Sequence, residues 1–159
     1  MAIKISVVGL GYVGLPLFVE LSKTFETVGF DVNRNRIQAL QKSEDLNNEI
    51  SSEALAGLKN RFTFDDSAMD NSDIFIVATP TPVDKDNQPD LKILISATEL
   101  VAAKLQKGNL VIFESTVFPG CTEEVCVPIL EKLSGLTYID DFGCGYSPER
   151  INPGDKQKT

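Results

Sequence analysis

Short apolar runs alternate along this chain with longer stretches whose apolar residues recur at helical spacing. Continuous apolar runs are typical of buried strands, whereas the helical spacing is typical of amphipathic helices. Residues 79–89 contain three prolines, which predicts a loop. We therefore predict strands at 3–8, 27–31, 61–64, 74–78, 110–114 and 142–146, and helices at 12–23, 33–41, 51–58, 91–105 and 122–133.

Strands that alternate with helices predict an α/β fold with a parallel sheet and helices on both faces. Right-handed crossovers make the doubly wound parallel sheet, the Rossmann fold, the natural arrangement. The length of 159 residues suits a single domain. Among the helix starts, we expect Ser51 or Ser52 to cap the third helix and Thr122 to cap the last.

Charge and composition narrow the classes of partner. The net charge of -8 argues against nucleic acid and against anionic membrane surfaces. No secretion signal is visible, and no apolar run approaches the roughly 20 residues that cross a bilayer. We therefore expect a cytoplasmic protein with reduced cysteines. The chain has no histidine, which excludes a Ser-His-Asp triad and a histidine-containing zinc site, and we expect no metal.

A glycine-rich turn is the strongest local signal. Gly9, Gly11 and Gly14 match G-x-G-x-x-G between a predicted strand and a predicted helix, the context that makes this motif specific for a dinucleotide. We expect Gly9 to form the tight turn, Gly11 to admit the pyrophosphate, and Gly14 to let the helix pack on the strand. The helix N-terminus would then face the phosphate charge.

An acidic residue stands where such a site needs one. Asp31 ends the second predicted strand, 20 residues after Gly11, where a carboxylate accepts hydrogen bonds from the adenosine ribose. That carboxylate favours NAD over NADP. Arg34 and Arg36 lie close by in the sequence and could accommodate a 2′-phosphate, so NADP stays an alternative. FAD and S-adenosylmethionine are further alternatives that the motif alone leaves open.

Three more polar, proline-containing segments follow predicted strands. They are TPTP at 79–82, ESTVFPG at 114–120 and SPERINPG at 147–154. The carboxyl ends of the strands border the ligand crevice in an open α/β sheet, so these segments should meet the glycine-rich turn there. A turn is the simpler interpretation of any one of them, but three at one edge favour a substrate site.

The segments GLGYVGLPL, TPTP, ESTVFPG and SPERINPG, in this order, resemble the UDP-glucose/GDP-mannose dehydrogenase family. The likeness is greatest to its UDP-N-acetylhexosamine 6-dehydrogenase branch, which serves surface polysaccharide biosynthesis. The resemblance implies that residues 1–159 are an N-terminal NAD-binding domain. It also implies that central and C-terminal UDP-sugar-binding domains lie outside this sequence, and that the full-length protein is a homodimer.

The resemblance also implies roles for single residues near the cofactor. Tyr12 and Val13 match turn residues beside the pyrophosphate, and Arg36 matches a basic residue near the adenosine. Thr81 and Thr116 match threonines beside the cofactor. The family also associates the position of Thr116 with a catalytic water near the reacting carbon.

The last motif carries the implied substrate contacts. Glu149 matches a glutamate implicated in a hydrolytic step, and Arg150 and Asn152 fall where the family begins its substrate-binding loop. The UDP-glucose branch has a second glutamate four residues after the first, where this chain has Pro153. UDP-glucose 6-dehydrogenase and a stand-alone NAD-binding module remain alternative functions. The absence of a Tyr-x-x-x-Lys pair excludes a short-chain dehydrogenase.

The family reaction oxidises the sugar C6 alcohol to a carboxylate with two NAD, through a thioester on a cysteine. That cysteine lies in a downstream G-G-x-C motif, which this chain lacks. Of the local cysteines, we expect Cys121 to be the most reactive, because it precedes a predicted helix N-terminus. We nevertheless expect no catalytic role for it. Cys126 and Cys144 are expected to be core residues.

Overall fold

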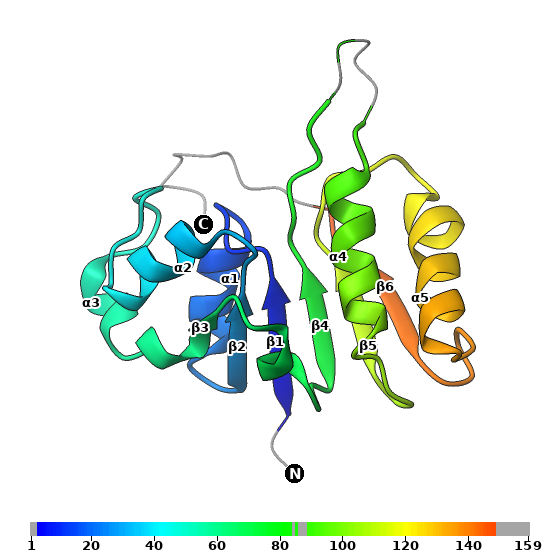
Figure 1. The fold of residues 1–159 in the computed structure, drawn as a ribbon, viewed down its shortest axis with the longest axis horizontal. Coiled ribbons are helices and arrows are strands. Elements are labelled where there is room, and N and C mark those ends of the chain that lie inside the picture. Colours follow the sequence, from blue (N-terminus) through cyan, green and yellow to red (C-terminus); the bar gives the residue numbers. More distant parts are fainter. Residues whose placement is uncertain (1–2, 84, 86–88, 149–159) are drawn as a thin grey trace.

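The computed structural model, which describes residues 3–83, 85 and 89–148, contains one six-stranded parallel sheet (Figure 1). Its strand order is β3-β2-β1-β4-β5-β6. β1 pairs with both β2 and β4, so the strand order reverses between β1 and β4. This confirms the predicted doubly wound sheet. The strands are β1 (Lys4–Val8), β2 (Glu26–Phe30), β3 (Phe62–Thr63), β4 (Ile74–Val77), β5 (Leu110–Phe113) and β6 (Gly143–Tyr146).

Helices pack against both faces of the sheet, and side chains of the central strands alternate between two cores. Val7 and Ile76 pack with the first three helices, whereas Val8 and Val77 pack with the last two. This double coverage explains why the central strands are continuous apolar runs. The α-helices are α1 (Gly14–Leu21), α2 (Arg34–Gln41), α3 (Ser52–Ala56), α4 (Lys92–Ala102) and α5 (Val127–Ser134). Short 3-10 turns lie at Lys59–Arg61 and Asp66–Met69.

Side chains cap the second and third helices, and the cap of the third helix was predicted. The side chain of Asn33 accepts hydrogen bonds from the N–H groups of Asn35 and Arg36, which starts α2. Ser51, rather than Ser52, accepts from the N–H of Ala54 and caps α3. Several predicted elements are longer than the observed ones at their ends, where helix and strand bounds are least determined by pattern.

The predicted helix at 122–133 differs from the structure. The segment Thr122–Cys126 is a π turn that leads into α5, and Cys121 already has helical backbone angles. Thr122 therefore does not cap the helix. Pro128 gives the physical reason, because a proline in a continuous α-helix lacks the N–H for the fourth residue before it and its ring clashes with that carbonyl. The N–H of Val127 instead donates to the oxygen of Thr122, five residues back.

Candidate functional site

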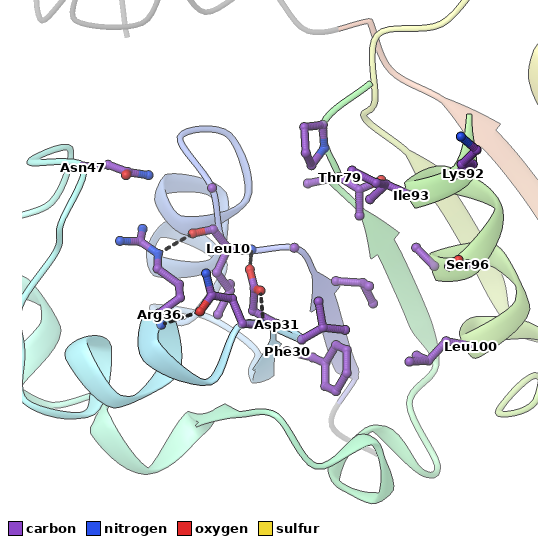
Figure 2. A pocket seen from close by; sticks show the side chains of 18 residues that line it. Leu10, Phe30, Asp31, Arg36, Asn47, Thr79, Lys92, Ile93, Ser96 and Leu100 are labelled. Carbon is purple, nitrogen blue, oxygen red and sulfur yellow. Dashed lines mark hydrogen bonds between the residues drawn. The ribbon is translucent and has the colours of Figure 1, made fainter. Parts of the chain in front are cut away.

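Two adjoining cavities lie at the carboxyl ends of the strands, where the strand order reverses. The first has a volume of about 670 Å³ and lies between the ends of β1 and β2 and the helix α4 (Figure 2). The second, of about 410 Å³, lies beside the segments that follow β4 and β5. Both cavities are lined by Gly11, Asn47, Ala78, Thr79 and Pro80. Such a crevice at a topological switch point is the ligand site expected of an open α/β sheet.

The three glycines of the turn differ in what surrounds them. Gly9 has φ +94°, and a Cβ there would lie 2.8 Å from the carbonyl oxygen of Ala78. A Cβ on Gly14 would lie 1.9 Å from the carbonyl oxygen of Gly9, so only glycine lets α1 start against the turn. A Cβ on Gly11 would meet no described atom within 4 Å. Gly11 therefore borders open space that a ligand can enter.

The start of α1 faces this open space. Val13 stands at its N-cap position, and no side-chain cap hydrogen bond is made there by the described residues. The first turn of α1 contains no acidic residue, so its positive dipole end is not offset by a carboxylate of its own. Tyr12 and Val13 line the second cavity. This arrangement can accept a phosphate at the helix N-terminus.

Asp31 lines the first cavity and accepts hydrogen bonds from two backbone N–H groups beside it. Its Oδ2 atom accepts a hydrogen bond of 2.9 Å from the N–H of Leu10, and its Oδ1 atom accepts one of 2.8 Å from the N–H of Asn33. The carboxylate therefore ties the glycine-rich turn to the start of α2 (Figure 2). Each carboxylate oxygen has a second lone pair, which leaves acceptor capacity for ribose hydroxyls.

The two arginines near Asp31 lie in different settings. Arg36 is buried and lines the first cavity; its Nε donates to the oxygen of Leu10 at 2.9 Å, and its Nη1 pairs with Asp45 at 2.6 Å. Asp45 thus largely neutralises the charge of Arg36. Arg34 lies over the ring of Phe64, 4.7 Å from its centre, and is not among the residues that line the cavity. Asp45 compensates the charge of Arg36, and Arg34 lies outside the cavity lining, an arrangement that favours NAD.

The carboxylate of Asp45 is held by several donors at once. Its side chain is 1% exposed, and besides Arg36 it accepts hydrogen bonds from the N–H groups of Asn47, Glu49 and Ile50. Burial alone would raise the pKa of Asp45, but these hydrogen bonds outweigh burial and hold its pKa below the ordinary value. The loop from 45 to 50 is therefore fixed beside the crevice.

The second cavity gathers the hydroxyl-bearing segments that the sequence placed at the strand ends. Its lining includes Thr81, Thr116 and Glu114. The Oγ1 atom of Thr81 is buried and has no hydrogen-bond partner among the described residues. Thr116 is exposed to the cavity, whereas its neighbour Ser115 is buried and donates to the carbonyl oxygen of Thr79 at 2.7 Å. An unpaired buried hydroxyl is costly, so Thr81 is suited to pair with a ligand.

The implied substrate residues Glu149, Arg150 and Asn152 lie outside the described residues. The chain leading to them does run along this edge, because the N–H of Ser147 donates to the carbonyl oxygen of Phe113 at the end of β5. The sequence analysis missed the apolar wall of the first cavity, which α4 provides. Its members recur at helical spacing in a segment for which the sequence analysis predicted a helix but no role in the site: Ile93, Ala97 and Leu100. Asn47 also went unrecognised, because its segment has no periodic pattern.

The structure contradicts the expectation that Cys121 is a reactive thiol. Cys121 is fully buried, and its backbone lies within the first helical turn. Burial raises the pKa of the Cys121 thiol, so the predicted activation by a helix N-terminus is wrong. Burial also raises the pKa of Cys126 to about 11 and that of Cys144 to about 12, in keeping with core positions. Among the described residues, no cluster of acidic or cysteine side chains is arranged to hold a metal.

Within the described part of the chain, no helix has the length and apolar character to span a membrane.

Comparison with solved structures gives UDP-D-ManNAc dehydrogenase from Pyrococcus horikoshii, with a TM-score of 0.87 and 34% identity over 96% of this chain and 37% of that one. Among curated proteins, UDP-N-acetyl-D-glucosamine 6-dehydrogenases from Pseudomonas aeruginosa and Salmonella typhi are 51% and 50% identical over 98% of the chain. The chain spans 37% of the length of both enzymes.

The family model of the UDP-glucose/GDP-mannose dehydrogenase NAD-binding domain matches residues 3–158. That match covers the glycine-rich turn, Asp31 and both cavities. The chain therefore belongs to the UDP-glucose/GDP-mannose dehydrogenase family, and it corresponds to the family's NAD-binding domain.

Proposed function

We propose that this chain is the cofactor-binding part of a UDP-sugar 6-dehydrogenase that oxidises a UDP-N-acetylhexosamine. This chain shares about half of its residues with each of two UDP-N-acetyl-D-glucosamine 6-dehydrogenases, which supports this substrate class. UDP-glucose is the alternative substrate. The complete enzyme would be a cytoplasmic homodimer that supplies a uronic acid sugar for surface polysaccharide.

The observation that carries the proposal is the pair of cavities that meet at Gly11. We take the first cavity, which Asp31 lines, as the adenosine side, and the second cavity, which Thr81 and Thr116 line, as the nicotinamide side. NAD, when bound, supplies the hydride acceptor. The residues present fit it, since Gly11 leaves room for the pyrophosphate and the Thr81 hydroxyl lacks a partner among the described residues.

Different residues of the chain then bind the cofactor, orient water and contact the substrate. Asp31 accepts hydrogen bonds from the adenosine ribose, and the N–H groups at Tyr12 and Val13 face the pyrophosphate. Thr116 orients a water near the reacting carbon. In the complete enzyme, Glu149 orients the water that hydrolyses the thioester, and Arg150 and Asn152 contact the UDP-sugar.

A substitution at Gly11 tests the phosphate site. Gly11 is not among the residues with positive φ, so Gly11→Val should leave the fold intact while its side chain fills the space of the pyrophosphate. We expect the parent chain, which spans 37% of the length of the related enzymes, to bind NAD with a Kd on the order of 0.1 mM, and Gly11→Val to abolish binding.

The matched control is Gly57→Val. Gly57 also has no described atom within 4 Å of a built Cβ, and it lies at the end of α3, away from both cavities. Calorimetry should show NAD binding to the control at the parent affinity. Normal binding by a folded Gly11→Val chain would place the phosphate elsewhere and refute the site.

A further inference from the structure

The junction of the two cavities is bordered by a loop that no sequence motif marked. Asn47, in this loop, lines both cavities, as Gly11 does. A dinucleotide that fills both cavities must pass its pyrophosphate through the part they share. Figure 2 shows the Asn47 side chain directed from its loop across the crevice toward Thr79.

Polar side chains are scarce at this junction. The residues common to both cavities are Gly11, Asn47, Ala78, Thr79 and Pro80. The hydroxyl of Thr79 already pairs with the Ser115 hydroxyl at 3.2 Å. The carboxamide of Asn47 is thus the side chain there that can donate two N–H groups to a ligand.

The loop that carries Asn47 is held by a chain of short polar contacts. The carbonyl oxygen of Leu10, in the glycine-rich turn, accepts from Arg36 Nε, and Arg36 Nη1 donates to Asp45 Oδ1. The same Oδ1 atom accepts from the N–H of Asn47 at 3.1 Å. Asn47 is therefore connected to the phosphate-facing turn through one buried ion pair.

Arg36, to which this loop is tied, also provides a donor at the cavity. Arg36 Nη2 is buried and has no hydrogen-bond partner among the described residues, and Arg36 lines the first cavity. Donors that lack protein acceptors suit a ligand with many acceptor oxygens. A pyrophosphate has such oxygens and carries negative charge.

We propose that Asn47 is a cofactor-binding residue that donates hydrogen bonds to the pyrophosphate from the loop tied to the glycine-rich turn. The buried Arg36–Asp45 pair positions it by fixing the loop. This inference rests on the proposed function, because it requires the dinucleotide to occupy both cavities.

The test is calorimetry on the whole chain with NAD and with ADP, which shares the two phosphates but lacks the nicotinamide riboside. Asn47→Ala should lower the affinity for both ligands about fivefold, as expected for the loss of one solvent-accessible hydrogen bond. Asn47→Asp should lower both affinities more than Asn47→Ala does, because a carboxylate there repels the phosphates. The difference in affinity between the two variants should shrink as the salt concentration is raised.

Leu46→Ala is the matched control, since Leu46 is the exposed neighbour of Asn47 and lines neither cavity. It should bind both ligands as the parent chain does. An Asn47→Ala chain with parent affinity would overturn the inference, and so would a loss confined to NAD. A parent chain that binds neither ligand would instead overturn the proposed function, and this inference with it.

Discussion

At the scale of single residues, one residue type serves three different purposes in the glycine-rich turn. Gly9 has a positive φ that favours glycine, and at Gly14 the absence of a Cβ allows the close contact with Gly9. Gly11 has neither a positive φ nor a described atom that a Cβ would meet. The sequence predicted the tight turn at Gly9 and the close packing at Gly14, because the motif lies between a strand and a helix, and the role of Gly11 toward a pyrophosphate stays a prediction. The surroundings of Gly11 therefore point to a ligand, whereas those of the other two are explained by the fold.

We expect Asp31 to favour NAD over NADP, and substitution of its carboxylate tests this role. Asp31→Asn removes the charge and keeps one oxygen that can accept from the N–H of Leu10, but its NH2 group loses the hydrogen bond that Oδ1 of Asp31 accepts from the N–H of Asn33. We expect NAD binding to weaken about tenfold, the size of a hydrogen bond to a charged group, and the preference over NADP to narrow. Calorimetry with both cofactors measures this.

The control for that experiment is Asp140→Asn, which makes the same charge change at an exposed residue shortly before β6 begins. That end of the strand lies at the opposite edge of the sheet from the crevice, so NAD affinity should be unchanged. Tighter binding of NADP than of NAD by the parent chain would contradict the role assigned to Asp31.

At the scale of elements, the sequence predicted the order and type of the strands and main helices, because two-sided burial produces continuous apolar strands. It did not predict the π turn before α5. The signal was Pro128, whose missing N–H and ring conflict with a regular helix over 122–133. The α4 side of the first cavity was not predicted, because most of the residues with which α4 lines it, Ile93, Ala97 and Leu100, are apolar and resemble core residues.

The contact between α1 and the turn before it gives a stability prediction. Gly14→Ala would place a Cβ 1.9 Å from the Gly9 carbonyl oxygen, a backbone atom that cannot rotate away. Overpacking of this kind costs about 1–3 kcal/mol or more, so the urea midpoint should fall clearly. Gly11→Ala should leave the midpoint almost unchanged, because its Cβ meets no described atom within 4 Å. Equal midpoints for the two variants would show that α1 can shift to make room.

At the scale of the whole molecule, an acidic chain has to bind an anionic dinucleotide. The net charge of -8 opposes such binding at long range, so local donors must supply the attraction. The helix start at Gly14 and the N–H groups around Gly11 provide these donors at one edge of the sheet. Asp45 meanwhile neutralises Arg36, so the adenosine side carries little positive charge, which is consistent with a cofactor that has no 2′-phosphate.

The distribution of thiols over the molecule bears on whether this chain alone can catalyse the oxidation. A thioester needs a thiolate beside the substrate, and thiolate activation needs an electropositive, accessible setting. The three cysteines pack in or against the core beneath α4 and α5, and burial raises the pKa of each. None of them lines either cavity. The chain therefore provides a cofactor site without a nucleophile.

The expected outcome is that this chain forms no NADH from UDP-N-acetylglucosamine, UDP-N-acetylgalactosamine or UDP-glucose, even at saturating NAD. Hydride transfer needs the sugar C6 held against the nicotinamide, and such positioning supplies several kcal/mol of the barrier. We do not expect a chain that spans 37% of the length of the related enzymes to supply it alone. NADH absorbance measures the turnover, and turnover that disappears in Cys121→Ser would overturn the assignment of the nucleophile to another region.

A longer protein containing this chain should be active and should lose activity in Glu149→Gln with NAD binding retained. Inactivity of that protein with all three sugars would favour a stand-alone NAD-binding module instead.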